Sequence, residues 1–152
     1  MLGASFFIWK EYTSFLGRES RELSELIAFV KNTRERMKCY LEPPSAWIAA
    51  YSTPELERVG FFTEMREGRD IEAAYIASAE NMCVDDDVKS AFSTMISEMG
   101  EGYLESEISA IDAALDKLCA IEKRVANDFH NKNRAAGAML AAITVGVIIL
   151  VI

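Results

Sequence analysis

Histidine and cysteine are scarce in this 152-residue chain, which contains one histidine and three cysteines. The single histidine, His130, rules out a metal site that needs two, and no cysteine has a histidine or second cysteine at the spacing of structural zinc. An odd number of widely separated cysteines is typical of a reducing compartment rather than of a disulfide framework. The sequence therefore predicts no metal and no cofactor.

Two further patterns are missing. No segment alternates apolar and polar residues beside Gly or Asn turn residues, so no pair of β-strands is predicted. No glycine-rich loop is followed by the Lys and Ser or Thr that hold phosphates. We therefore expect no catalytic residues, no enzymatic activity and no small-molecule substrate. An enzymatic alternative would need a cleft of carboxylates such as Glu105 and Glu107 near Glu64.

Charge is distributed unevenly along the chain, whose formal net charge is -8. Residues 1–41 carry seven basic and five acidic side chains, residues 42–116 carry four and seventeen, and residues 117–152 carry five and two. An acidic middle between basic ends offers no extended basic face to a phosphate backbone. Binding to nucleic acid is therefore not expected.

The segment 135–152 contains no charged residue. If this segment is helical, it would span about 27 Å, close to the roughly 30 Å of a bilayer's hydrocarbon core. The sequence therefore predicts a C-terminal transmembrane helix in the cell membrane, with the rest of the chain in the cytoplasm. A buried helix of a soluble protein is the alternative. The basic residues that would form a collar at the membrane surface are Lys123, Arg124, Lys132 and Arg134.

The first seventeen residues are apolar until Lys10 and Glu11 interrupt them. The apolar part is too short to cross a bilayer, but a helix of this composition can lie in the interface. We expect residues 1–17 to form a truncated or interfacial membrane anchor, residues 18–134 a cytoplasmic helical bundle, and residues 135–152 the transmembrane helix.

Apolar residues recur at helical spacing through most of the chain, and capping or breaking residues separate the helical stretches. In the first helix the apolar positions include Leu23, Leu26, Ile27 and Val30. The sequence therefore predicts an all-α fold, an antiparallel bundle of about five to six helices whose last helix continues into the transmembrane segment. The expected boundaries are Pro43–Pro44 after a first helix from residue 18, Thr53–Pro54 and Gly68 for the second helix, Asp70 for the start of the third, Asp85–Asp87 and Gly100 for the fourth, and Tyr103 for the start of the last.

The last helix carries a heptad-like series of apolar residues, Leu104, Ile108, Ile111, Leu115 and Leu118. Steps of four and three are typical of a helix that packs along a seam. We expect this series to face the core, so Leu115→Asp would bury a charge and cost several kcal/mol. Neither Gly nor Pro interrupts the helix before the apolar run, so both are expected to form one continuous helix.

Two charged groups are candidate partner surfaces. Successive carboxylates on a helix point about 100° apart, so helix capping explains the acidic group better than a bound metal does. A solvated charged face is the plainer interpretation of either group. The basic group comprises Arg34, Arg36 and Lys38, and the acidic group comprises Asp85, Asp86 and Asp87.

Several segments, in a fixed order, carry a family resemblance: RELSEL at 21–26, RERMKCY at 34–40 before two prolines, LERVGF at 56–61, REG at 66–68, and a long last helix after Met99–Gly100. They resemble the stage III sporulation protein AB family, which is similar to the cytoplasmic domain of type II secretion F proteins. The resemblance covers nearly the whole chain. It implies an all-helical domain anchored on the mother cell side of the septum. Members of the family usually have a full N-terminal transmembrane span as well.

The resemblance also implies a function. We expect a non-enzymatic platform that docks the stage III sporulation secretion-type ATPase to the membrane, beside other membrane proteins of the same complex. A tail-anchored helical adaptor or tether without a transport role is the alternative. The heptad-like spacing serves packing within one chain and self-association equally, so it leaves the oligomeric state open.

Overall fold

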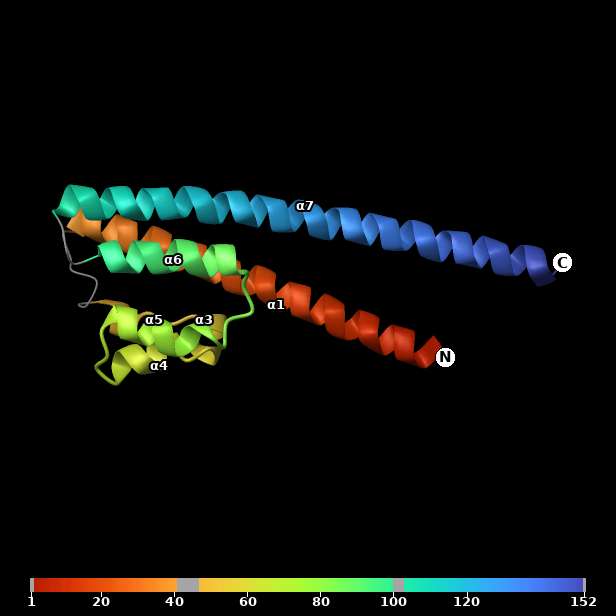
Figure 1. Cartoon of the computed structure of the whole chain (residues 1–152), viewed down its shortest axis with the longest axis horizontal. Helices are drawn as coiled ribbons and strands as arrows, with labels where there is room; N and C mark the ends of the chain where they lie inside the picture. Colours follow the sequence, from red (N-terminus) through yellow and green to blue (C-terminus); the bar gives the residue numbers. More distant parts are fainter. Residues whose placement is uncertain (1, 41–46, 100–102, 152) are drawn as a thin grey trace. The chain divides into compact units, whose positions relative to one another are not determined.

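The computed structural model describes the backbone of residues 2–40, 47–99 and 103–151. Within these ranges it describes side chains from residue 17 to residue 131, except at residues 40, 49 and 129. The regular structure of the described backbone is entirely helical, with no strand (Figure 1). The all-α prediction is therefore confirmed for this part of the chain.

Six α-helices and two short helical turns make up the described regular structure. The last helix begins beside Tyr103, as the sequence predicts, whereas the expected stops at Pro43–Pro44 and Gly100 lie outside the described residues. The elements are α1 (Leu2–Glu35), the π-helical turn η1 (Arg36–Tyr40), the 3-10 turn η2 (Ile48–Ala50), α3 (Pro54–Arg58), α4 (Phe61–Arg66), α5 (Ile71–Ala79), α6 (Asp86–Glu98) and α7 (Leu104–Val151).

The chain divides into two compact units, residues 1–122 and residues 123–152. The first unit contains α1 to α6 and the beginning of α7, and the second contains the remainder of α7. The backbone of α7 is nevertheless one continuous helix from Leu104 to Val151. The prediction that the last helix continues into the apolar run is therefore confirmed for the backbone.

Among the described residues, no helix combines the length and the apolar character needed to cross a membrane. The side chains of residues 1–16 and 132–152 lie outside the described residues. The expected anchors at 1–17 and 135–152, and the collar residues Lys132 and Arg134, therefore stay predictions.

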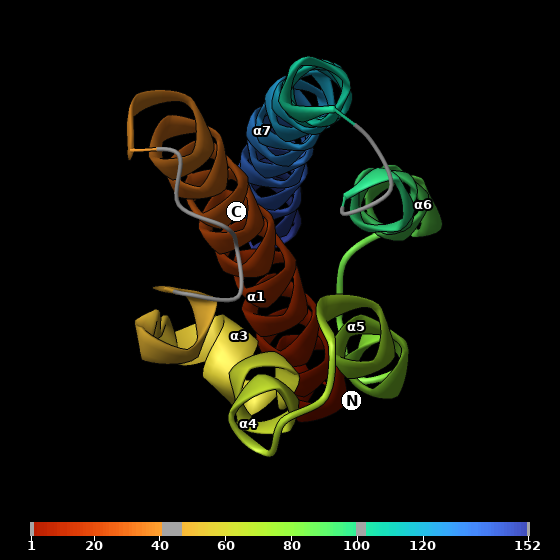
Figure 2. The ribbon, with the colours of Figure 1, turned by 90° about the vertical axis from the view of Figure 1, so that its left-hand side faces the viewer.

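In the first unit, α1 lies among α3, α4, α5, α6 and the beginning of α7 (Figure 2). Its side of the core includes the predicted Leu23, Leu26, Ile27 and Val30, each at most 3 % exposed. Phe29 was not among the residues predicted to face the core, but it is fully buried at the centre of an aromatic cluster. The rings whose centroids lie 5.6–5.9 Å from that of Phe29 belong to Trp47, Tyr51, Phe61, Phe62 and Phe92.

The second predicted helix, from Thr53–Pro54 to Gly68, is in fact two helices, α3 and α4. Gly60 separates them with a φ of 91°, a left-handed conformation that glycine adopts without a steric penalty. The prediction of one helix is therefore wrong. The break was missed because Leu56 before it and Phe62 after it are both buried, so the apolar spacing continues across Gly60. Spacing alone therefore could not reveal it.

The seam predicted along α7 is wrong in part. Ile111 and Leu118 are fully buried, whereas Ile108 and Leu115 are half-buried and Leu104 is 39 % exposed. A straight α-helix has 3.6 residues per turn, so a strict 3.5-residue repeat drifts away from the core. Leu118 is therefore a better position than Leu115 at which to test the packing of α7. Among the described side chains of α7, the buried ones are Ala110, Ile111, Ala114 and Leu118.

Candidate functional site: an ion-pair network between α1 and α3

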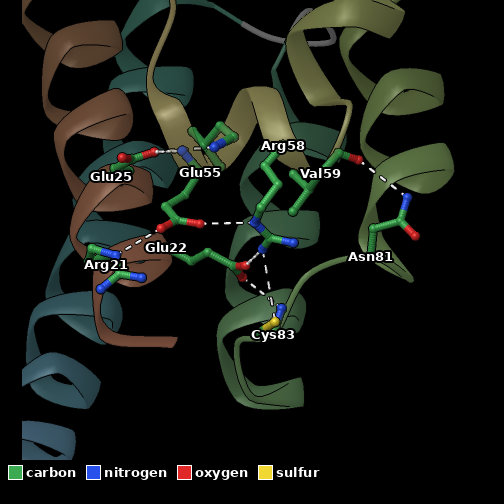
Figure 3. Close-up of polar contacts among 9 residues, drawn as sticks. Arg21, Glu22, Glu25, Glu55, Arg58, Val59, Asn81 and Cys83 are labelled. Atoms are coloured by element: carbon green, nitrogen blue, oxygen red, sulfur yellow. Dashed lines mark hydrogen bonds and ion pairs between the residues drawn. The ribbon is translucent and has the colours of Figure 1, made fainter. Parts of the chain in front are cut away.

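Charged side chains join α1 to α3 through ion pairs and hydrogen bonds that we call the α1–α3 network (Figure 3). Two glutamates of α1, Glu22 and Glu25, are three positions apart and therefore lie on the same side of the helix. Each one binds a different part of α3. The network consists of Arg21, Glu22 and Glu25 of α1, Glu55 and Arg58 of α3, and the backbone N–H of Cys83.

Glu22 is a buried carboxylate with only 1 % of its surface exposed. The Arg58 guanidinium donates to one of its oxygens through Nη2, and the Cys83 N–H donates to the other at 2.6 Å. A buried charge is costly unless it is paired and hydrogen-bonded, and here both oxygens have a donor. Glu22 therefore ties α1 to α3 and to the segment that connects α5 with α6.

Glu25 supplies the N-terminal cap of α3 from a different helix. One oxygen, Oε2, accepts from the backbone N–H of Glu55 at 2.8 Å and from that of Leu56 at 3.2 Å. The first residue of α3 is Pro54, which has no N–H to satisfy. The two free donors at the start of α3 are therefore both held by one carboxylate of α1.

Thr53 occupies the N-cap position of α3, as the sequence predicts, but its side chain makes no capping hydrogen bond. Its Oγ1 is instead buried and finds no hydrogen-bond partner among the described residues. The expected local cap at this position is therefore wrong. The reason is tertiary: the charged oxygen of Glu25 already accepts from the N–H groups that a threonine cap would bind.

Glu55 lies between two arginines. Its carboxylate accepts from Arg21 Nε at 2.8 Å and from Arg58 Nε at 2.9 Å. The hydrogen bond from Arg21, followed by that from Arg58, holds the pKa of Glu55 below its usual value. The pKa of Arg58 is raised in return, chiefly by its hydrogen bond to Glu55. The network therefore favours the charged form of both Glu55 and Arg58.

The chemistry of the network is that of structural support. No group of three or more potential metal ligands occurs in the part of the chain that the structure describes. The carboxylate oxygens of Glu22 and Glu55 accept from N–H donors of the protein itself. Such groups position helices and are poorly placed to bind an ion or transfer a proton.

The basic group predicted near the end of the first helix lies on α1 and η1. Arg34 makes a two-point ion pair with Asp112 of α7, which raises the pKa of Arg34. Arg36 lies over the ring of Trp47, with its guanidinium carbon 5.1 Å from the ring centroid. Lys38 is exposed. Two of the three side chains therefore make contacts within the bundle.

The acidic group lies at the start of α6, where the sequence placed it. Asp85 occupies the N-cap position without a side-chain capping bond, and Asp86 and Asp87 follow in the first turn. All three are exposed, as are the collar residues Lys123 and Arg124. Carboxylates in the first turn of a helix interact favourably with its dipole, so their placement has a local explanation.

The carboxylates of the enzymatic alternative lie on two helices, Glu64 on α4 and Glu105 and Glu107 on α7. Glu64 pairs with Arg69 at 2.8 Å, and Glu105 is exposed in the first turn of α7. Glu107 is half-buried in the same turn.

No family model, no curated protein and no solved structure matches this chain.

The network was not predicted, although the sequence held one signal of it. Glu22, Leu26 and Phe29 are spaced by four and three, so Glu22 occupies a core position of the helical repeat. A carboxylate in such a position requires a buried partner. That partner, Arg58, is 36 residues away, and no local rule identifies it.

Proposed function

We propose that this chain is a non-enzymatic, membrane-anchored platform component of a sporulation secretion or channel complex. In this proposal the helical bundle docks a cytoplasmic secretion-type ATPase to the membrane on the mother cell side of the septum. The observation that carries it is the continuity of α7. One helix contributes the buried Ile111 and Leu118 to the bundle and continues to Val151, within the segment 135–152 that contains no charged residue.

The anchor is the first part of the proposal. An uncharged helix of this length matches the hydrocarbon core of a bilayer, and basic residues precede it. We expect the full chain to sediment with membranes and to resist extraction by high salt or alkali. A variant that ends at Arg134 keeps only the expected interfacial segment 1–17, so high salt or alkali should release it into the supernatant. Recovery of the full chain in the supernatant would reject the anchor.

The identity of the partner is the second part, and its support is the sequence resemblance alone. Within the two candidate groups, the exposed charges include Lys38 of the basic group and Asp86 and Asp87 of the acidic group. Arg34 and Arg36 are poor probes of docking, because reversing them would also disturb Asp112 and Trp47.

The partner is tested by affinity purification from detergent-solubilised membranes of sporulating cells. We expect a secretion-type ATPase and membrane proteins of the same complex among the captured chains. Lys38→Glu and the double variant Asp86→Lys, Asp87→Lys separate the two surfaces, because each reverses exposed charge without removing a core contact. Loss of the ATPase in one variant identifies its docking surface. Capture of other proteins without an ATPase would reject the platform and favour a tail-anchored adaptor.

A further inference from the structure

α3 is a helix that cannot be stable by itself. It has five residues, and Leu56 is its one buried side chain. An isolated helix shorter than about twelve residues is marginal in water, because nucleation fixes several residues for each hydrogen bond gained. The stability of α3 must therefore come from its neighbours.

Residues 21–25 of α1 contact both ends of α3. Glu25 holds the N–H groups at its start, while Arg21 and Glu22 hold the side chains of Glu55 and Arg58. The local alternative at Thr53 is not used. α3 thus receives its cap and two of its ion pairs, Arg21–Glu55 and Glu22–Arg58, from residues 21–25.

These contacts tolerate little movement of α1. One residue of helical register corresponds to about 1.5 Å along the axis and about 100° around it. The two capping bonds are 2.8 and 3.2 Å long, so such a shift would take Oε2 of Glu25 out of hydrogen-bonding range. The N–H groups of Glu55 and Leu56 would then lose the acceptor that they have in this structure, where the hydroxyl of Thr53 does not bind them.

We infer that α3 is a conditional helix within the fold: it is helical while Glu25 of α1 caps it, and it opens locally, without the rest of the bundle, when that cap is lost. α1 is one continuous helix from Leu2 to Glu35. Residues 21–25 are part of this helix, so the cap of α3 moves only with α1. The inference stands on the network and does not depend on the proposed membrane anchor or partner.

Hydrogen exchange measured by mass spectrometry on the full chain in mild detergent tests the inference. Glu25→Ala should accelerate exchange of the amides of residues 55–59 by about tenfold, the effect of removing a helix cap, and leave α5 and α6 unchanged. The matched control is Glu57→Ala, which removes another carboxylate of the same region. Glu57 pairs with Arg66 of α4 and makes no bond to α1 in the described structure, so its removal should leave the amides at the start of α3 protected.

A rescue variant separates capping from general destabilisation. In the double variant Glu25→Ala, Thr53→Asp, the aspartate supplies a local cap, and slow exchange of residues 55–59 should return. If Glu25→Ala leaves exchange in α3 unchanged, or accelerates it equally over the whole bundle, the inference is wrong. It is equally wrong if Glu57→Ala has the same effect on these amides or if the aspartate fails to restore protection.

Discussion

α5 and α3 begin with similar sequence signals but are stabilised in different ways. Asp70 caps α5 locally, because its side chain accepts from the N–H of Ala73 at 2.7 Å. Thr53 precedes α3 in the same position, yet its hydroxyl makes no such bond and the cap comes from Glu25 of α1. A capping residue in the sequence therefore marks where a helix begins, and tertiary contacts decide what caps it.

The two helices also differ in how they are held at their sides. α5 buries Ala74, Tyr75 and Ser78, and the hydroxyl of Tyr75 donates to the backbone oxygen of Lys89 in α6 at 2.7 Å. α3 buries one leucine and is otherwise held by charged groups. We therefore expect α3 to be sensitive to loss of charge, whereas α5 depends on packing and on its own cap.

Leu56→Ala should have the largest effect, because Leu56 is fully buried and is the one buried side chain of α3. A cavity of this kind costs about 2–5 kcal/mol of unfolding free energy. Thermal unfolding of the full chain in detergent, followed by circular dichroism, measures the loss. Ile76→Ala in α5 is the control: Ile76 is 65 % exposed, and its truncation should cost less than about 0.5 kcal/mol. Equal effects of the two changes would contradict the described packing of α3.

Glu22→Gln should come next. The neutral amide keeps the shape of the side chain but presents an NH₂ group to one of the two donors, Arg58 or the Cys83 N–H. Leaving a buried hydrogen-bonding group unsatisfied costs about 1–3 kcal/mol. Glu80→Gln, at the exposed C-terminal end of α5, removes the same charge without a buried partner and is the matched control. If both variants unfold at the same denaturant concentration, the bonds of Glu22 to Arg58 and to the Cys83 N–H do not stabilise the folded chain.

Features governed by short-range rules were predictable from the sequence. The spacing of Leu23, Leu26, Ile27 and Val30 identified the buried face of α1, and Asp70 marked a helix start that the structure confirms. Both depend on residues within two helical turns of one another. All-helical architecture follows from the same periodicity.

The α1–α3 network could not be predicted in the same way. Glu25 and Glu55 are 30 residues apart, and Glu22 and Cys83 are 61 apart, so their pairing is a product of the fold. The break at Gly60 was hidden because buried residues continue the apolar spacing on both sides of it. The drift of the α7 seam was hidden because 3.5- and 3.6-residue repeats coincide over short stretches.

Two cap variants examine the comparison of α5 with α3 directly. Asp70→Ala removes the cap that α5 uses and should cost about 1 kcal/mol of unfolding free energy. Thr53→Val keeps the size of the side chain and removes a buried hydroxyl without a described partner, so stability should stay the same or rise slightly. Urea unfolding of both variants measures the difference. A loss at Thr53→Val as large as that at Asp70→Ala would show that the threonine hydroxyl caps α3 after all.

The smallest effect is expected from acid. Arg21 and Arg58 lower the pKa of Glu55 in the folded state, so the unfolded chain takes up its proton at a higher pH than the folded one. The stabilisation is therefore complete above the ordinary glutamate pKa of about 4.3 and is lost as the pH falls through the lower folded value.

Glu55→Gln should flatten the dependence of unfolding free energy on pH in this range and change little near neutrality beyond the loss of the ion pairs. Glu57→Gln removes a second carboxylate whose pKa is lowered by Arg66, so the slope should fall further in the double variant. A pH dependence that is unchanged in Glu55→Gln would mean that the pKa of Glu55 is the same in the folded and the unfolded chain. The stability of α3 would then come from Leu56 and Glu25 rather than from the ion pairs of Glu55.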